Sequence, residues 1–129
     1  MRVRDLPPRA LVAVDPETSL AEVARRMRLH DTDSVAVMAE GRLLGIVTER
    51  NLVGAIADGV DPEQVHADVV MAADPATITA DEDVTMVAVK MVALGVRHLT
   101  VLDEEKRPVG LLSARDLVVV LDRSAASAD

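Results

Sequence analysis

The residues best suited to do chemistry lie in the stretch Gly110-Leu111-Leu112-Ser113-Ala114-Arg115-Asp116-Leu117. Two apolar residues lead into the hydroxyl of Ser113, and the carboxylate of Asp116 follows three positions later. The pattern predicts a buried strand that ends where a helix begins. A helix N-terminus presents backbone N–H groups and the positive end of the helix dipole, so phosphates and other anions bind there readily. A carboxylate beside it can accept both hydroxyls of a ribose, as acidic residues do in dinucleotide-binding folds.

The same spacing has a simpler interpretation. A serine followed three residues later by an acidic residue is a common capping pattern, in which the two side chains only stabilise the helix N-terminus. On spacing alone, capping is the slightly better explanation of Ser113 and Asp116. Both interpretations therefore stay open at this point.

A second copy of the stretch occurs earlier in the chain, as Gly45-Ile46-Val47-Thr48-Glu49-Arg50-Asn51-Leu52. Thr48 keeps the hydroxyl, but Asn51 replaces the aspartate. An asparagine has one acceptor oxygen and no charge, so it is a poorer partner for a ribose diol. We therefore expect the first pocket to be weaker, empty or tuned to another ligand, and we favour Asp116 if only one site is occupied.

Matching elements precede both copies and must position them. Apolar residues recur at helical spacing in two places, which predicts two amphipathic helices: Leu20, Val23, Ala24 and Met27, then Val84, Val87, Ala88 and Met91. Ser19 and Asp83 precede these helices as N-caps. Each helix is followed by a predicted hairpin and a second helix, over 35–38, 43–47 and 49–57 and again over 98–102, 109–112 and 114–121. One supersecondary unit is therefore used twice.

This organisation resembles the CBS domain, named after cystathionine beta-synthase and usually found as a tandem pair called a Bateman module. The resemblance rests on the two Gly-apolar-apolar-Ser/Thr-x-x-Asp/Asn stretches and on the segments 34–37 and 97–101, and it covers the chain except a short C-terminal tail. It implies an α+β fold of tandem β-α-β-β-α repeats with pseudo-two-fold symmetry. We place the first repeat at 1–62, the second at 63–123 and a flexible tail at 124–129.

The resemblance also implies an adenosine-containing ligand, such as AMP, ADP, ATP, NAD or S-adenosylmethionine, bound in the cleft between the repeats. In the family, the aspartate of the motif typically holds the ribose, and basic residues ahead of the hairpin often reach phosphates. Carried onto this chain, the ligand-binding residues are Ser113, Asp116, Arg115, Thr48, Asn51, Arg97, His98, Thr77, Ile78 and Val14. It stays open which pocket Arg97 and His98 serve, or whether Arg97 forms only a surface ion pair. Arg50 and Arg115 contact either phosphate or a subunit interface, and we slightly favour the interface.

Composition narrows the classes of function. The chain has no Phe, Trp or Tyr and no Cys, and its formal net charge is −8. An adenine ring would therefore lie between aliphatic side chains and backbone, and the negative charge works against binding nucleic acid or an anionic membrane. The three histidines share no ligand spacing, so we expect no metal site and no cofactor other than the regulatory nucleotide. There is no signal peptide and no bilayer-spanning apolar run, which favours a cytoplasmic location.

The sequence thus predicts a regulatory sensor for an adenosine-type ligand. No catalytic constellation is found, so we do not expect an enzyme. The alternative is a ligand-free dimerisation or scaffolding module, because CBS pairs resembling this one commonly form homodimers. We expect a homodimer through the helices after Thr48 and Ser113, with the apolar set Leu52, Val53, Ile56, Leu117, Val118 and Leu121. The sequence does not identify the regulated protein partner.

Overall fold

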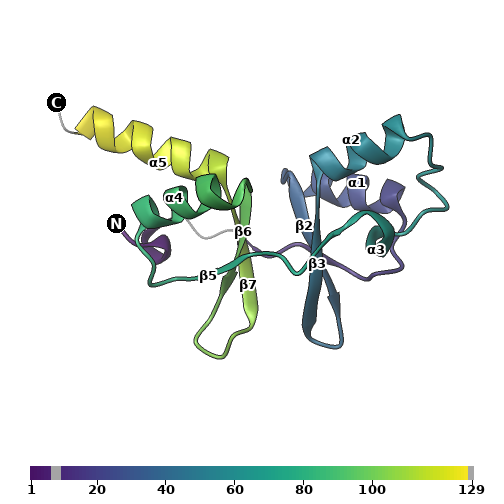
Figure 1. The fold of residues 1–129 in the computed structure, drawn as a ribbon, viewed down its shortest axis with the longest axis horizontal. Helices are drawn as coiled ribbons and strands as arrows, with labels where there is room; N and C mark the ends of the chain where they lie inside the picture. The colour runs from purple at the N-terminus through teal and green to yellow at the C-terminus, as the bar shows by residue number, and fades with distance from the viewer. Residues whose placement is uncertain (7–9, 128–129) are drawn as a thin grey trace. The chain divides into compact units, whose positions relative to one another are not determined.

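The computed structural model describes residues 1–6 and 10–127, with side chains described up to residue 120 (Figure 1). It is an α+β protein that divides into two compact units. The first-repeat unit is Leu11–Pro75, and the second-repeat unit combines Met1–Ala10 with Ala76–Asp129. Each unit contains one complete β-α-β-β-α repeat, which confirms the predicted fold class.

The first-repeat unit places a four-stranded sheet against two long helices. In chain order its elements are β1 (Ala13–Val14), α1 (Leu20–Leu29), β2 (Ser34–Ala39), β3 (Arg42–Thr48), α2 (Glu49–Ala57), α3 (Ala67–Val70) and β4 (Ala72–Ala73). The strand order is β1-β2-β3-β4, with β1 parallel to β2 and the other pairs antiparallel. Val23 and Met27 of α1 pack against Val35, Val37 and Val47 of the sheet. The predicted helix spacing therefore marks the core-facing side of α1.

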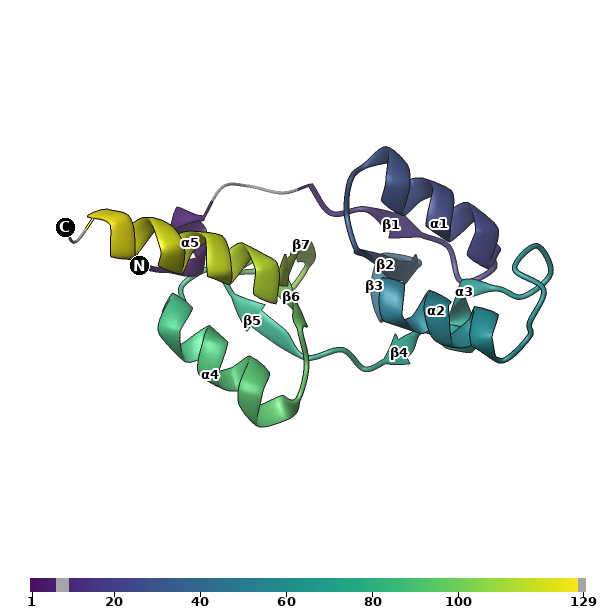
Figure 2. The same cartoon turned by 90° about the horizontal axis from the view of Figure 1, so that it is seen from above.

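Among its described residues, the second-repeat unit repeats this plan with a three-stranded sheet, which Figure 2 shows from a second direction. Its elements are the 3-10 turn η1 (Val3–Asp5), β5 (Thr77–Thr79), α4 (Val84–Leu94), β6 (His98–Leu102), β7 (Pro108–Ser113) and α5 (Ala114–Ser127). Strands β5 and β6 are parallel, and β6 and β7 form the predicted hairpin. Val87 and Met91 of α4 pack on Ile78, Leu99 and Leu112 of the sheet. Helix α5, which we expected over 114–121, continues to Ser127.

The segment that leads into each repeat packs on the other repeat. Near the N-terminus, the backbone N–H of Val3 donates to the carbonyl of Glu82 at 3.0 Å, just ahead of α4. Figure 1 shows this purple turn beside the green helix. In the other unit, the N–H of Ala67 in α3 donates to the carbonyl of Thr18 at 2.8 Å, just ahead of α1. The compact units are thus assembled by exchange of equivalent lead-in segments.

The N-caps predicted at Ser19 and Asp83 are confirmed. The Ser19 hydroxyl accepts the N–H of Glu22 at 3.2 Å, and the Asp83 carboxylate accepts the N–H of Thr85 at 2.8 Å. Gly95 ends α4 with a φ of 67°, a left-handed conformation that glycine adopts without a steric penalty. Within the described part of the chain, no helix has both the length and the apolar character needed to cross a membrane.

Candidate functional site

Ser113 and Asp116 form a reciprocal cap at the start of α5. The backbone N–H of Ser113 donates to Oδ2 of Asp116 at 2.9 Å, and the Ser113 hydroxyl donates to the same oxygen at 3.2 Å. In return, the N–H of Asp116 approaches the Ser113 hydroxyl oxygen at 3.4 Å. The capping interpretation of the spacing is therefore realised in the structure, and any ribose contact must be made by a carboxylate that already holds the helix.

Thr48 and Asn51 make the same arrangement at the start of α2. The N–H and the hydroxyl of Thr48 both donate to Oδ1 of Asn51, at 2.9 and 3.0 Å. The N–H of Asn51 donates to the Thr48 hydroxyl at 3.3 Å. The two copies of the motif thus share one backbone geometry, although the residue at the third helical position differs.

The chemical difference between the two caps lies in how many acceptor positions each side chain has. An amide oxygen has two lone pairs, and the two bonds from Thr48 account for both on Asn51. A carboxylate offers roughly four acceptor positions, and both bonds from Ser113 go to a single oxygen, Oδ2 of Asp116. Asp116 is therefore the better candidate to hold a ribose while it keeps its cap.

The helix N-termini present fewer N–H groups to an anion than the sequence suggests. The N–H of Ala114 donates to the carbonyl of Arg97 at 2.8 Å, and the N–H of Glu49 donates to the carbonyl of Asp33 at 3.0 Å. The third N–H of each helix is the one already used in the cap. A phosphate at α5 would therefore rely mainly on side-chain cations.

Arg97 and His98 lie beside the cap of their own unit. His98 is the antiparallel partner of Ser113, and the Arg97 carbonyl accepts the first N–H of α5. The Arg97 side chain is exposed and that of His98 is half-buried. Arg115, in the first turn of α5, is also exposed. The structure thus brings these three basic residues to the same end of sheet β5-β6-β7 as Ser113 and Asp116.

The remaining sequence candidates occupy the first strand of each repeat. Ile78 and Val14 point into the cores of their units, with 2% and 4% of their surfaces exposed. Their side chains are thus used in packing, and a ligand could meet only their backbone. Thr77 is half-buried, and its carbonyl accepts a hydrogen bond from the ammonium group of Lys90 at 2.8 Å. Lys90 was not among the sequence candidates, although Arg26 makes the equivalent contact with the carbonyl of Ala13 at 3.4 Å.

The apolar set expected at a dimer interface is only partly on the surface. Val53, Ile56 and Val118 are exposed, but Leu117 is buried in the core of its unit and Leu52 packs partly against the other core. Leu117 therefore cannot contact a second subunit, which corrects that part of the expectation. The side chain of Leu121 lies outside the described residues. No group of three or more potential metal ligands occurs among the residues that the structure describes.

One polar residue of this region belongs to none of the sequence motifs. Thr100 lies in the middle of β6, and it is the only described residue with a buried side-chain oxygen or nitrogen that lacks a hydrogen-bond partner. The signal that could have found it is the comparison of the repeats. Ala36 stands at the equivalent position, so the strand does not need a hydroxyl there.

Comparisons with known proteins agree with this architecture. The chain is 30% identical over 114 residues to an uncharacterised protein of Methanopyrus kandleri, which covers 87% of this chain and 58% of that protein. The chain therefore spans a little over half the length of this curated relative.

Two solved structures are similar over nearly the whole chain. One is a CBS domain protein of Pyrobaculum aerophilum in complex with AMP, at 25% identity and a TM-score of 0.83, covering 97% of this chain and 99% of that one. The other is the CBS domain pair of protein MJ0100 in complex with 5′-methylthioadenosine and S-adenosyl-L-methionine, at 25% identity and a TM-score of 0.83, covering 94% and 99%. Residues 3–58 and 65–123 each match the CBS domain family. Because these two matches span most of the chain, the protein belongs to the CBS domain family, as a tandem CBS pair.

Proposed function

We propose that the protein is a regulatory module that binds an adenosine-type ligand at the cap of α5. The observation that carries the proposal is the grouping of Asp116, Ser113, Arg97, His98 and Arg115 at one end of a single small sheet. Similar CBS pairs hold AMP, or 5′-methylthioadenosine and S-adenosyl-L-methionine, in their structures. All of these ligands share an adenosine group, which supports a ligand of this class here.

The second-repeat unit offers groups for two parts of such a ligand, the ribose and the phosphates or charged tail. Asp116 would accept the ribose hydroxyls, with Ser113 beside it. Arg97, His98 and Arg115 would face the phosphates or the charged tail of the ligand. The role is regulatory rather than catalytic, as is general for CBS domain pairs. Binding can shift the protein between conformations only as far as the ligand prefers one of them.

Calorimetry with AMP, ATP, NAD and S-adenosylmethionine tests the proposal. We expect Asp116→Ala to weaken binding of the preferred ligand by tenfold or more, because a hydrogen bond to a charged group contributes about 1.5–3 kcal/mol. Asn51→Ala is the matched control, since it removes the equivalent cap and should leave this affinity unchanged.

Unliganded stability separates capping from binding. Loss of either cap should cost about 1 kcal/mol in urea denaturation, so the two variants should unfold alike while only one loses affinity. If none of the four compounds binds the wild-type chain, the proposal is wrong.

A second candidate is a dimerisation module, with or without a ligand. Exposed apolar side chains on α2 and α5 favour it, namely Val53, Ile56, Val118 and Val119. Apolar side chains gathered on helix surfaces are typical of protein–protein contacts. We propose a homodimer through these helices, which is compatible with ligand binding at the cap of α5.

A further inference from the structure

The outer face of α4 is apolar and open to solvent. Met86, Val89 and Val92 lie on this face at helical spacing, and more than half of the surface of each residue is exposed. Val87 and Met91 point the other way, into the core of the second-repeat unit. Apolar side chains that gather on one exposed helix face are typical of a surface that another protein covers. The outer face of α4 therefore indicates an interface.

This face adjoins the apolar surface of α5. The two helices pack against each other, and Figures 1 and 2 both show them side by side. Val118 and Val119 of α5 are exposed and belong to the surface proposed for the homodimer. A stable interface buries about 800 Å² on each partner, which is more than three side chains on one helix supply. The contact must therefore extend over both helices of the second-repeat unit.

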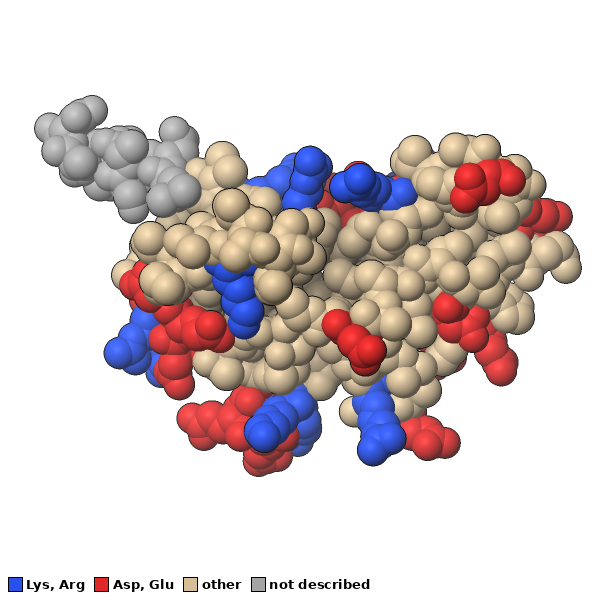
Figure 3. Space-filling model, in the orientation of Figure 1, with Lys and Arg blue, Asp and Glu red and all other residues tan. Residues whose placement is uncertain are grey.

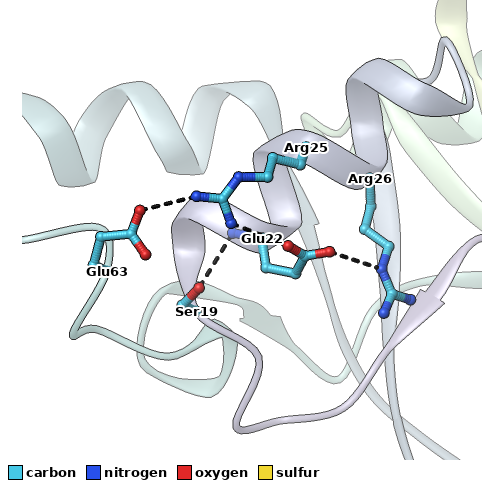
Figure 4. A network of polar contacts seen from close by, with 5 residues as sticks. All are labelled: Ser19, Glu22, Arg25, Arg26 and Glu63. Carbon is cyan, nitrogen blue, oxygen red and sulfur yellow. Dashed lines mark hydrogen bonds and ion pairs between the residues drawn. The ribbon is translucent and has the colours of Figure 1, made fainter.

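The first-repeat unit does not offer a matching face to α4. In α1, the positions equivalent to Met86 and Val89 hold Glu22 and Arg25. These two side chains pair with each other, and Arg25 also pairs with Glu63, as Figure 4 shows. Burying such charges beneath an apolar face would remove them from water, which costs free energy even when they stay paired. A second copy that placed its α1 on α4 would therefore bind poorly.

We propose that α4 packs against α4 of a second copy, so that the second repeats of the two chains meet. This inference rests on the proposed homodimer and adds which repeats face each other. A surface that pairs with its own copy about a two-fold axis must be complementary to itself. An uncharged apolar face meets this condition. The exposed Asp83 at the N-terminus of α4 favours antiparallel helices, because parallel ones would bring two Asp83 carboxylates together.

Single cysteines test the arrangement cleanly, because the chain has no cysteine of its own. With copper–phenanthroline as oxidant, we expect Val89→Cys to form a disulfide-linked dimer, because a residue near the two-fold axis meets its own copy within disulfide reach. A mixture of Met86→Cys and Val92→Cys should also cross-link, since antiparallel helices centred on Val89 bring these two positions together. The matched control is Arg25→Cys, at the equivalent position of α1, which should stay a single chain on a denaturing gel without reductant.

A charge at the same position gives a second, independent readout. In Val89→Glu, two carboxylates would face each other across the two-fold axis, so we expect the dimer dissociation constant to rise about a hundredfold or more. Light scattering over a dilution series measures this change. An equimolar mixture of Val89→Glu and Val89→Lys should recover the dimer mass, because opposite charges then meet. If α4 instead packed on α1 of the second copy, the new carboxylate would face Arg25 and the dimer would persist.

The outcomes separate this inference from the proposals on which it rests. A disulfide between Val89→Cys and Arg25→Cys chains in a mixture, or a Val89→Glu variant that remains dimeric, overturns the inference while the homodimer stands. A dimeric wild type in which none of the α4 cysteines cross-links overturns it as well. A monomeric wild type contradicts the homodimer and this inference together. The proposal of an adenosine-type ligand is decided separately, by calorimetry with Asp116→Ala.

Discussion

Helices α1 and α4 occupy equivalent places in the two repeats, yet their outer faces differ in character. On α1, Glu22 pairs with Arg25 at 3.1 Å and with Arg26 at 3.5 Å, and Arg25 reaches Glu63 at 3.0 Å, as Figure 4 shows. These contacts lower the pKa of Glu22, chiefly through the hydrogen bond from Arg25. On α4, the positions equivalent to Glu22, Arg25 and Arg28 carry Met86, Val89 and Val92, with 61%, 53% and 83% of their surfaces exposed. The surface over α4 in Figure 3 is accordingly largely free of charged residues.

The comparison of α1 with α4 shows which helix positions the fold constrains. The inner stripe is the same in both helices, because Val23 and Met27 in one and Val87 and Met91 in the other fill equivalent cores. The outer face contacts no core and is free to diverge between a solvated ion-pair network and an apolar surface. The caps follow the same rule: the backbone bonds are kept, while Asp116 and Asn51 differ in chemistry.

The largest expected effect concerns assembly, in which the charged face of α1 should take no part. We expect light scattering at micromolar concentration to give wild type a mass twice the 13.8 kDa of one chain. Val53→Glu combined with Val118→Glu should convert it to a monomer, because both side chains are exposed apolar groups of the proposed interface. Arg28→Glu, on exposed α1, is the control and should leave the mass unchanged. A monomeric wild type contradicts the proposed homodimer.

The next effect tests β4, the fourth strand of the first-repeat sheet. A Cβ at Gly45 would lie 2.6 Å from the carbonyl oxygen of Ala72 in β4. We expect Gly45→Ala to lower the free energy of unfolding by about 2 kcal/mol or more, in the range of overpacked sites. Gly54→Ala, on open α2, should instead stabilise the chain by up to about 1 kcal/mol. Urea denaturation measures both, and a neutral Gly45→Ala would show that β4 is not held against β3.

A smaller effect is expected from a substitution that makes the first cap chemically like the second. Asn51→Asp gives the first repeat the acceptor positions that Asp116 has in the second. If Asn51 limits the first site, calorimetry should show a second bound ligand, or an affinity at that site raised about tenfold, equivalent to about 1.4 kcal/mol. Unchanged stoichiometry and affinity would mean that other residues, such as the acidic Asp33 in place of Arg97, prevent binding there.

The smallest effect is a difference in pH dependence between the N-caps of α1 and α4. The N–H of Thr85 donates to Asp83 and, as the main cause, lowers the pKa of that carboxyl. The Asp83 carboxylate therefore stabilises the folded protein fully above the ordinary aspartate pKa of about 3.9. This stabilisation is lost as the pH falls through the lower pKa that Asp83 has in the folded protein. Asp83→Asn should be less stable than wild type at neutral pH, and the gap should close in acid. Ser19→Ala, which removes an uncharged cap, should cost the same stability at both pH values.

Much of the fold could be read from the sequence, because its signals are local. The helical spacing of the apolar residues, the caps at Ser19 and Asp83 and the glycine at position 95 each act within one or two turns of chain. The repetition of the Ser113–Asp116 pattern at Thr48 and Asn51 then indicated the tandem pair. The candidate residues came mainly from the resemblance to CBS domains, since spacing alone could not separate a ligand contact from a cap.

The tertiary structure decided what depends on contacts far apart in sequence. The two lead-in segments resemble each other, so nothing local says that Val3 packs beside Glu82 and Ala67 beside Thr18. Burial is likewise a property of the assembled unit: Leu117 looked like an interface residue and lies in a core, while Thr100 looked like an ordinary strand residue and has a buried hydroxyl without a partner. The sequence by itself determined the repeating elements and their ends, because these follow from short-range periodicity and hydrogen bonding. Only the folded chain determined which copy each segment joins and which polar groups are removed from water, because both depend on packing between distant residues.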